Sequence, residues 1–137
     1  MPATTYMGVD ARHDHSMRIP RPDRTVALAT PNACNNCHAD KSAAWAVEAL
    51  HKWGAGGKPG AQTFAEAFHL ADSQAPGADA ALAAIVGDDK SSALARASAL
   101  QRFAQAPTNA ALDLATKALG DRNPMTRAAA VAVVANA

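Results

Sequence analysis

The two cysteines of this 137-residue chain lie three positions apart, and a histidine directly follows the second one. The stretch reads CNNCH, and its reactive side chains are those of Cys34, Cys37 and His38. This spacing suits a thiol–disulfide exchange, part of a zinc site, or a haem that two thiols bind covalently. The residues around the motif discriminate between these three kinds of site.

The neighbouring sequence counts against the first two kinds of site. A thioredoxin-like pair follows a strand in a βαβ unit, whereas VALATPNA precedes this motif. Structural zinc needs four ligands, and Cys34, Cys37 and His38 supply three. A disulfide across so short a loop would add little stability. Haem attachment uses all three residues, so we expect haem c bound by Cys34 and Cys37, with His38 as an axial ligand of its iron.

The composition predicts an all-α protein. Hydrophobic residues make up 49% of the chain and aromatic residues only 4%, with alanine contributing much of the apolar content. Alanine favours helix and buries little area, so closely packed helices are expected. The net charge of +1 argues against nucleic acid as the main partner. No apolar run is long enough for a membrane span, and the first residues do not resemble a signal peptide.

Two elements should position the motif. Residues 1–33 predict an irregular extended arm, because Pro20 and Pro22 disfavour helix at the residues before them and no period of two is visible. A helix is expected over residues 40–53, with Asp40 or Ser42 as its cap and a glycine directly after its end. Its Trp45 is expected to cover a haem ring or to pack beneath it.

From position 63 onward the sequence repeats itself with a period of about 31 to 33 residues. Ala75-Pro76 recurs as Ala106-Pro107, and Gly87-Asp88 recurs as Gly120-Asp121. Helices are expected within residues 63–74, 77–89, 91–105 and 108–124, and from 125 onward. The second should end near Gly87, and the fourth should begin at a cap on Thr108 or Asn109 and stop at Gly120. Helix pairs that recur with such a period are typical of α-solenoids. The stretch DRNPMTRAAAVAVV resembles a HEAT-type repeat, in which an Asp-x-x-Pro turn leads into a helix carrying arginine and small apolar residues.

The stretch TYMGVDARHDHSMRIPRPDRTVALATPNACNNCHADKSAAWAVEAL resembles the last haem-binding segment of bacterial multihaem c-type cytochromes. Such proteins carry several CxxCH motifs followed by HEAT- or TPR-like repeats, whereas this chain has one motif. The resemblance implies a haem-binding segment at residues 1–54, a linker at 55–62 and HEAT-like repeats at 63–137. It also implies a piece of a larger periplasmic or otherwise exported protein. Its partners would be a redox protein or the neighbouring haem domains of that parent chain.

A second axial ligand sets the chemistry of such a haem. The resemblance singles out HDHSMRIPRP, and we therefore expect His15 to bind the iron opposite His38. Less favoured alternatives are Met17, His13 and Met7, a ligand from elsewhere in the parent protein, or an open position. His51 and His69 are expected to be ordinary packed or surface histidines. Arginines of the arm would either pair with the haem propionates or stay exposed among aspartates; they are Arg12, Arg18, Arg21 and Arg24.

These expectations describe an electron carrier that is not itself an enzyme. Two imidazole ligands leave the iron no free site and give it a low potential, which suits single-electron transfer. The alternative is a helical-repeat interaction or haem-sensor module with a structural or ligand-binding haem. A peroxidase or a nitrogen-oxide reductase would need an open iron site beside acid–base residues, for which His13 and Asp14 are candidates.

Overall fold

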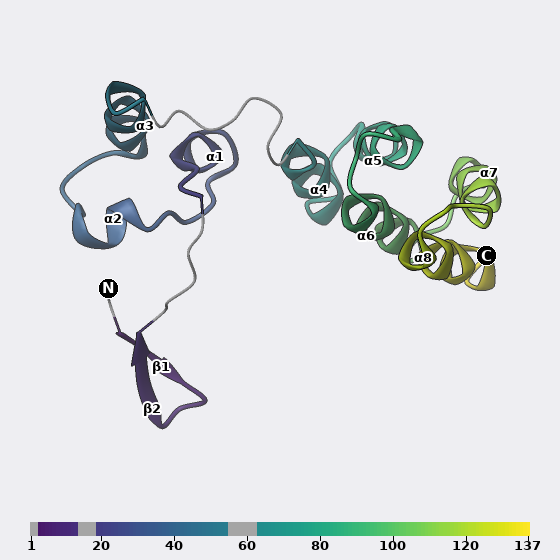
Figure 1. Cartoon of the computed structure of the whole chain (residues 1–137), viewed down its shortest axis with the longest axis horizontal. Helices are drawn as coiled ribbons and strands as arrows, with labels where there is room; N and C mark the ends of the chain where they lie inside the picture. The colour runs from purple at the N-terminus through teal and green to yellow at the C-terminus, as the bar shows by residue number, and fades with distance from the viewer. Residues whose placement is uncertain (1–2, 14–18, 55–62) are drawn as a thin grey trace. The chain divides into compact units, whose positions relative to one another are not determined.

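The computed structural model describes residues 3–13, 19–54 and 63–137. These residues form eight helices and one small two-stranded sheet (Figure 1). The chain divides into two compact units, Met1–Ala61 and Gln62–Ala137. The predominance of helix confirms the predicted all-α class. No helix in the described ranges is long and apolar enough to cross a membrane.

A hairpin of two antiparallel strands begins the first unit: β1 (Ala3–Tyr6) and β2 (Asp10–His13). Met7 and Gly8 in the turn both have positive φ, 51° and 78°, as tight hairpin turns require. The prediction of an irregular arm is wrong for these residues. Every residue of β2 is exposed, and a strand that buries neither face leaves no period of two in the sequence.

Helix α1 (Pro22–Leu28) also lies where an irregular arm was expected. Pro22 is its first residue, a position where the missing N–H is not needed and the fixed φ suits a helix. The proline therefore starts a helix, while Arg21 before it stays non-helical, as its position before a proline predicts. Two further helices complete the first unit, α2 (Cys34–Cys37) and α3 (Ala43–Lys52).

The expected helix after the motif is confirmed as α3. Ser42 is its cap, and its hydroxyl accepts a hydrogen bond of 3.2 Å from the backbone N–H of Trp45. Gly54 follows the end of the helix with φ of 67°. Helix α3 packs against α1 and, more lightly, against α2.

The second unit consists of five helices in its described residues, near the positions that the sequence predicts. They are α4 (Ala65–Asp72), α5 (Ala78–Gly87), α6 (Ala93–Phe103), α7 (Asn109–Ala118) and α8 (Pro124–Ala135). The starts of α5 and α7 are separated along the chain by the same interval as the starts of α6 and α8. The most extensive packing joins α6 to α8, and α5 contacts α4, α6 and α7 (Figure 1).

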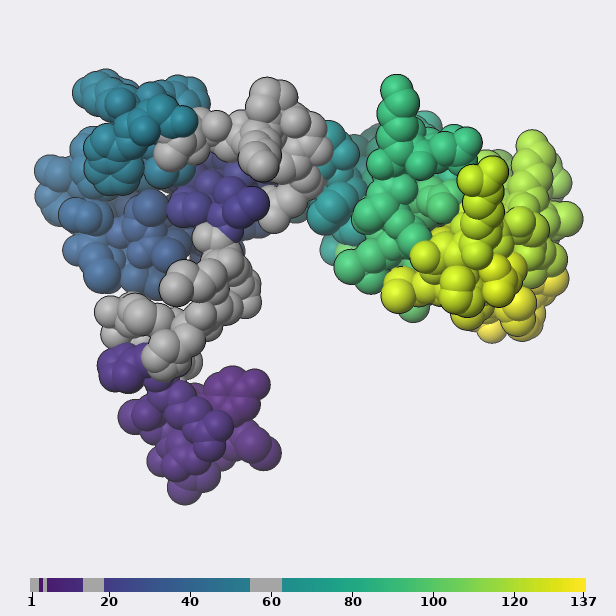
Figure 2. All heavy atoms as spheres, viewed as in Figure 1, coloured from purple at the N-terminus to yellow at the C-terminus, as the bar shows by residue number. Residues whose placement is uncertain are grey.

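Small side chains dominate the core of the second unit. Ala99, Ala111, Ala115 and Ala130 have no exposed surface, and neither do Leu100 and Val133. Because alanine keeps little bulk between the helices, their backbones approach closely. The helices form one continuous body of atoms in the space-filling view (Figure 2).

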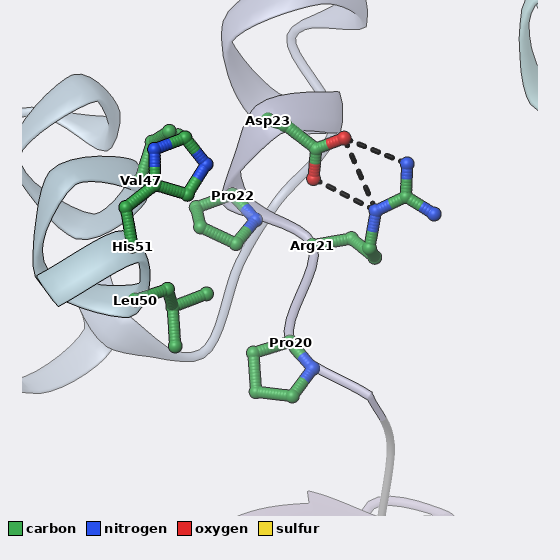
Figure 3. Close-up of a pocket in the computed structure, with 7 residues that line it drawn as sticks. All are labelled: Pro20, Arg21, Pro22, Asp23, Val47, Leu50 and His51. Atoms are coloured by element: carbon green, nitrogen blue, oxygen red, sulfur yellow. Dashed lines mark hydrogen bonds and ion pairs between the residues drawn. The ribbon is translucent and has the colours of Figure 1, made fainter. Parts of the chain in front are cut away.

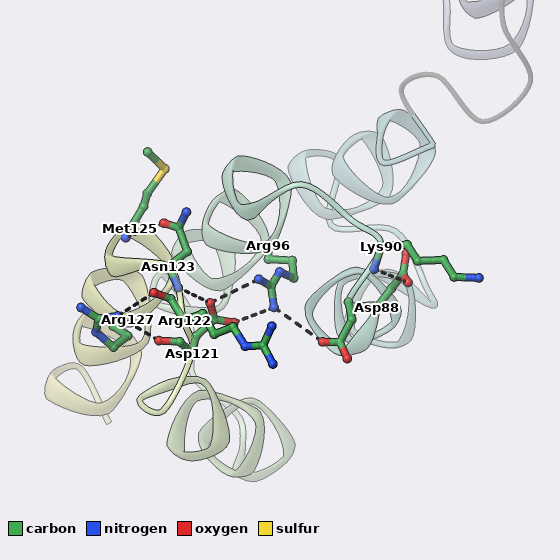
Figure 4. A network of polar contacts seen from close by, with 9 residues as sticks. Asp88, Lys90, Arg96, Asp121, Arg122, Asn123, Met125 and Arg127 are labelled. Atoms are coloured by element: carbon green, nitrogen blue, oxygen red, sulfur yellow. Dashed lines mark hydrogen bonds and ion pairs between the residues drawn. The ribbon is translucent and has the colours of Figure 1, made fainter.

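An ion-pair network joins the turn before α8 to α6 (Figure 4). The guanidinium of Arg96 donates two hydrogen bonds to Asp121, at 2.6 and 3.2 Å, and both side chains are largely buried. Asp121 also accepts from the backbone N–H of Asn123 at 2.8 Å. That backbone donor, followed by the charge of Arg96, lowers the pKa of Asp121. The network therefore stabilises the packing of α8 on α6 when Asp121 is ionised.

Replacing Asp121 by asparagine should lower the free energy of unfolding at pH 7 by about 1–3 kcal/mol, because a charged acceptor is lost. A carboxyl with a lowered pKa stabilises the fold above its unfolded-state pKa, near 4, and this stabilisation is lost as the pH falls through the folded-state value. The difference between wild type and Asp121→Asn should therefore narrow below about pH 4. Urea unfolding followed by circular dichroism measures this difference in the free energy of unfolding, and Asp113→Asn at an exposed position is the control. A difference that does not change with pH would show that the charge of Asp121 does not stabilise the fold.

Candidate functional site

Both cysteines lie on α2, a single helical turn, and both are free thiols. Cys34 is half-buried and Cys37 is exposed. His38 follows as the residue that ends the helix, and its backbone N–H donates to the carbonyl oxygen of Cys34 at 2.9 Å. The turn therefore carries two thiols and an imidazole within one short stretch of chain.

Asn35, between the two cysteines, joins this turn to the residues on both sides of it. Its side-chain amide donates to the carbonyl oxygens of His38, at 3.3 Å, and of Lys41, at 2.7 Å. Its own oxygen accepts from the side chain of Asn32 at 2.7 Å. Asn32 in turn accepts from the backbone N–H of Asn35 and donates to the hydroxyl of Thr25 on α1. The cysteine turn is thus held by side-chain hydrogen bonds as well as by its one helical turn.

The imidazole of His38 packs against the indole of Trp45 at the start of α3. Their ring centroids are 4.9 Å apart and their planes are tilted by 52°. This separation lies within the range in which aromatic rings attract each other. The capping bond from Trp45 to Ser42 fixes the point at which α3 begins, and so places this indole beside the motif.

A cavity of about 230 Å³ lies between the cysteine turn and α3. Cys34, Cys37 and His38 line one side of it. The side chains that α3 contributes are all apolar or aromatic: Trp45, Ala46, Ala49, Leu50 and, directly after the helix, Trp53. The volume is below that of a typical enclosed ligand pocket, so these residues form one side of an open hollow.

The first unit has almost no hydrophobic core. Among its described residues only Pro22 and Ala46 are buried. Trp53 keeps 75% of its surface exposed, and Val26 keeps 60%. Small units with so little buried apolar surface commonly gain stability from a disulfide, a metal or another bound group.

A second cavity, of about 360 Å³, lies between the start of α1 and the end of α3 (Figure 3). Pro20, Pro22, Val47, Leu50 and His51 line it together with a charged pair. The pair consists of Arg21 and Asp23, whose closest contact is 2.7 Å. The hydrogen bond from Arg21 lowers the pKa of Asp23 and raises that of Arg21. The two charges are opposite, so the pair adds no net charge to this cavity.

The arginines expected at the haem propionates lie next to aspartates where the structure describes them. Arg12 pairs with Asp10 at 3.0 Å on the exposed hairpin. Arg21 contacts Asp23, and Arg24 lies 3.9 Å from the same carboxylate. Arg18 lies outside the described residues. The second expectation, that these arginines stay exposed among aspartates, therefore holds among the described arginines for Arg12 alone, since the side chains of Arg21 and Arg24 lie beside Asp23 but are only 14% and 15% exposed.

The structure describes only some of the proposed axial ligands. His15 and Met17 lie outside the described residues. His13 lies at the end of β2, and Met7 lies in the hairpin turn with 89% of its surface exposed. Of the other histidines, His51 lines the second cavity and His69 lies on α4 of the other unit.

The two thiols and the imidazole that follows them are the side chains that covalent attachment of a haem would use. Within the described ranges no group of three or more metal-binding side chains is placed to hold a metal ion. The two thiols are free, the imidazole is adjacent, and the apolar wall of α3 faces them across one cavity. Sequence reasoning found Cys34, Cys37, His38 and Trp45; it missed the two asparagines, whose role depends on the path of the turn.

Comparison of the chain with protein-family models, with curated proteins and with solved structures finds no match.

Replacing Asn35 by alanine should loosen the cysteine turn, because the carbonyls of His38 and Lys41 lose a donor. We expect the turn to lose about 1–2 kcal/mol of local stability, which corresponds to roughly tenfold faster amide hydrogen exchange. NMR can measure this exchange at His38 and Lys41, because their backbone N–H groups donate hydrogen bonds within the turn. Asn36→Ala is the matched control, since Asn36 is exposed and lies between the same cysteines. Equal exchange rates in the two variants would contradict a clamping role for Asn35.

Proposed function

We propose that this chain carries one covalently bound haem c and transfers electrons as part of a larger multihaem cytochrome. Cys34 and Cys37 would bind the haem through thioethers, and His38 would bind its iron. When bound, the haem supplies an iron that accepts and releases one electron at a time. The protein supplies the attachment, one axial ligand and the apolar wall, and it is not itself an enzyme.

One observation carries the proposal: both thiols and the imidazole line the same cavity as the apolar face of α3. That face leaves Trp53 largely exposed, in a unit with two buried residues among those described. A flat apolar group fixed to the cysteines would cover this face and supply the burial that the unit lacks. The free state of both thiols is what attachment requires.

The second unit has a different proposed role. Its helices pack in pairs whose starts recur at a constant interval, and Arg96 and Asp121 join successive pairs. We propose that residues 63–137 are HEAT-like repeats of an α-solenoid, joined by residues 55–62 to a haem-binding segment at 1–54. A solenoid offers an extended surface for a redox partner or for neighbouring haem domains. Haem c attachment outside the cytoplasm would place the parent protein in the periplasm or otherwise export it.

Haem attachment is tested by producing the protein with and without a c-type maturation system. We expect haem that stays on the chain in a denaturing gel, and its loss when Cys34 and Cys37 are both replaced by alanine, because no thiol then remains. The exposed Asn36→Ala should keep its haem and serves as the control. A wild-type protein that folds equally well in both hosts and never acquires haem would rule the proposal out.

The second axial ligand is proposed to be His15. Replacing it by alanine should convert a six-coordinate low-spin spectrum into one with an open position that binds CO, because the iron loses one imidazole. Met17→Ala tests the thioether alternative, and His51→Ala, which alters the second cavity, is the control. If neither His15→Ala nor Met17→Ala changes the spectrum, neither residue is the ligand. A wild-type iron that already binds CO readily would favour the haem-sensor alternative.

A further inference from the structure

We propose that Trp45 is a positioning residue that sets the rotation of the His38 imidazole in the haem site. The inference rests on the proposed function, since the orientation of this ring matters only if it binds iron. Its basis is the packing of the two rings, with centroids 4.9 Å apart and planes tilted by 52°.

The side chain of His38 has little else to fix it. The residue is exposed, and the hydrogen bonds at this position involve its backbone: its N–H donates to Cys34, and its carbonyl accepts from Asn35 and Lys41. Among the described residues no hydrogen bond restrains the imidazole itself. The backbone is therefore fixed, while the two side-chain torsions depend on what the ring packs against.

Trp45 is a firm support for that ring. It is half-buried at the start of α3, and its backbone is fixed by the capping bond to Ser42. Helix α3 is in turn packed against α1. A ligand held by a residue on a rigid element keeps its geometry better than one held by a loop. Trp53 lines the same cavity but is 75% exposed at the end of the helix, so it offers a matched comparison.

The orientation of an axial imidazole has a measurable electronic consequence. In a low-spin ferric haem the planes of the axial ligands, that of the His38 imidazole among them, determine how the iron orbitals split, and hence the anisotropy of the electron paramagnetic resonance signal. A ring held in one rotation gives one sharp set of g values, whereas a ring free to rotate gives a broadened or shifted set. The haem-free protein offers a second measure, because an indole beside an imidazole shifts the resonances of its protons.

The experiment compares wild type, Trp45→Phe, Trp45→Ala, Trp53→Ala and His51→Ala, with and without haem. In the haem-free proteins we expect ring-current shifts of the His38 protons that Trp45→Ala abolishes and Trp53→Ala leaves unchanged. In the haem-loaded proteins we expect Trp45→Ala to shift or broaden the g values, with Trp45→Phe in between. His51→Ala, which lies outside this cavity, should give the wild-type g values. The haem-free spectra and Trp45→Phe keep the test decisive if Trp45→Ala fails to take up haem.

The outcomes separate this inference from the proposed function. A wild type that retains haem, with the same g values in both Trp45 variants, overturns the positioning role and leaves haem binding intact. His38 resonances that do not respond to Trp45→Ala in the haem-free protein overturn it as well. A wild type that never binds haem overturns the proposed function, and the positioning role with it.

Discussion

Burial of apolar surface is divided very unequally between the two units, and the organisation of the chain follows from this. The hydrophobic core cluster lies entirely in the second unit, while the described part of the first unit buries only Pro22 and Ala46. Burial can stabilise the five helices of the second unit by themselves. The first unit depends instead on local hydrogen bonds, such as those of Asn35, and it leaves Trp53, directly after α3, 75% exposed.

Much of the fold could be predicted because its signals are local. Capping residues such as Ser42 and Thr108, and the regular recurrence of short sequence patterns, gave the helices close to their observed places. The hairpin and α1 were missed for opposite reasons. The hairpin buries neither face of β2, so it leaves no hydrophobic pattern, and α1 begins at a proline that otherwise predicts extended chain.

The candidate site was predictable where its residues are adjacent in sequence. Cys34, Cys37 and His38 could be assigned without knowing the fold, since one helical turn brings them together. The asparagine bonds could not, because Asn35 contacts Lys41 only through the particular path of the turn after His38. The contact between His38 and Trp45 is intermediate: the sequence places an indole nearby, but the tilt and separation of the rings depend on where Ser42 starts the helix.

The alanines at the centre of the second unit have a consequence for how this sequence can change over time. Ala99, Ala111, Ala115 and Ala130 have no exposed surface, so any larger side chain there would push two helices apart. Val131 and Val134 on the outer face of α8 are substantially exposed and can be exchanged for polar residues at little cost to packing. Selection on the fold would therefore act on the volume of a few small side chains more than on hydrophobicity. Divergent copies of this unit would therefore keep small side chains at these buried positions more strictly than they keep particular residue types.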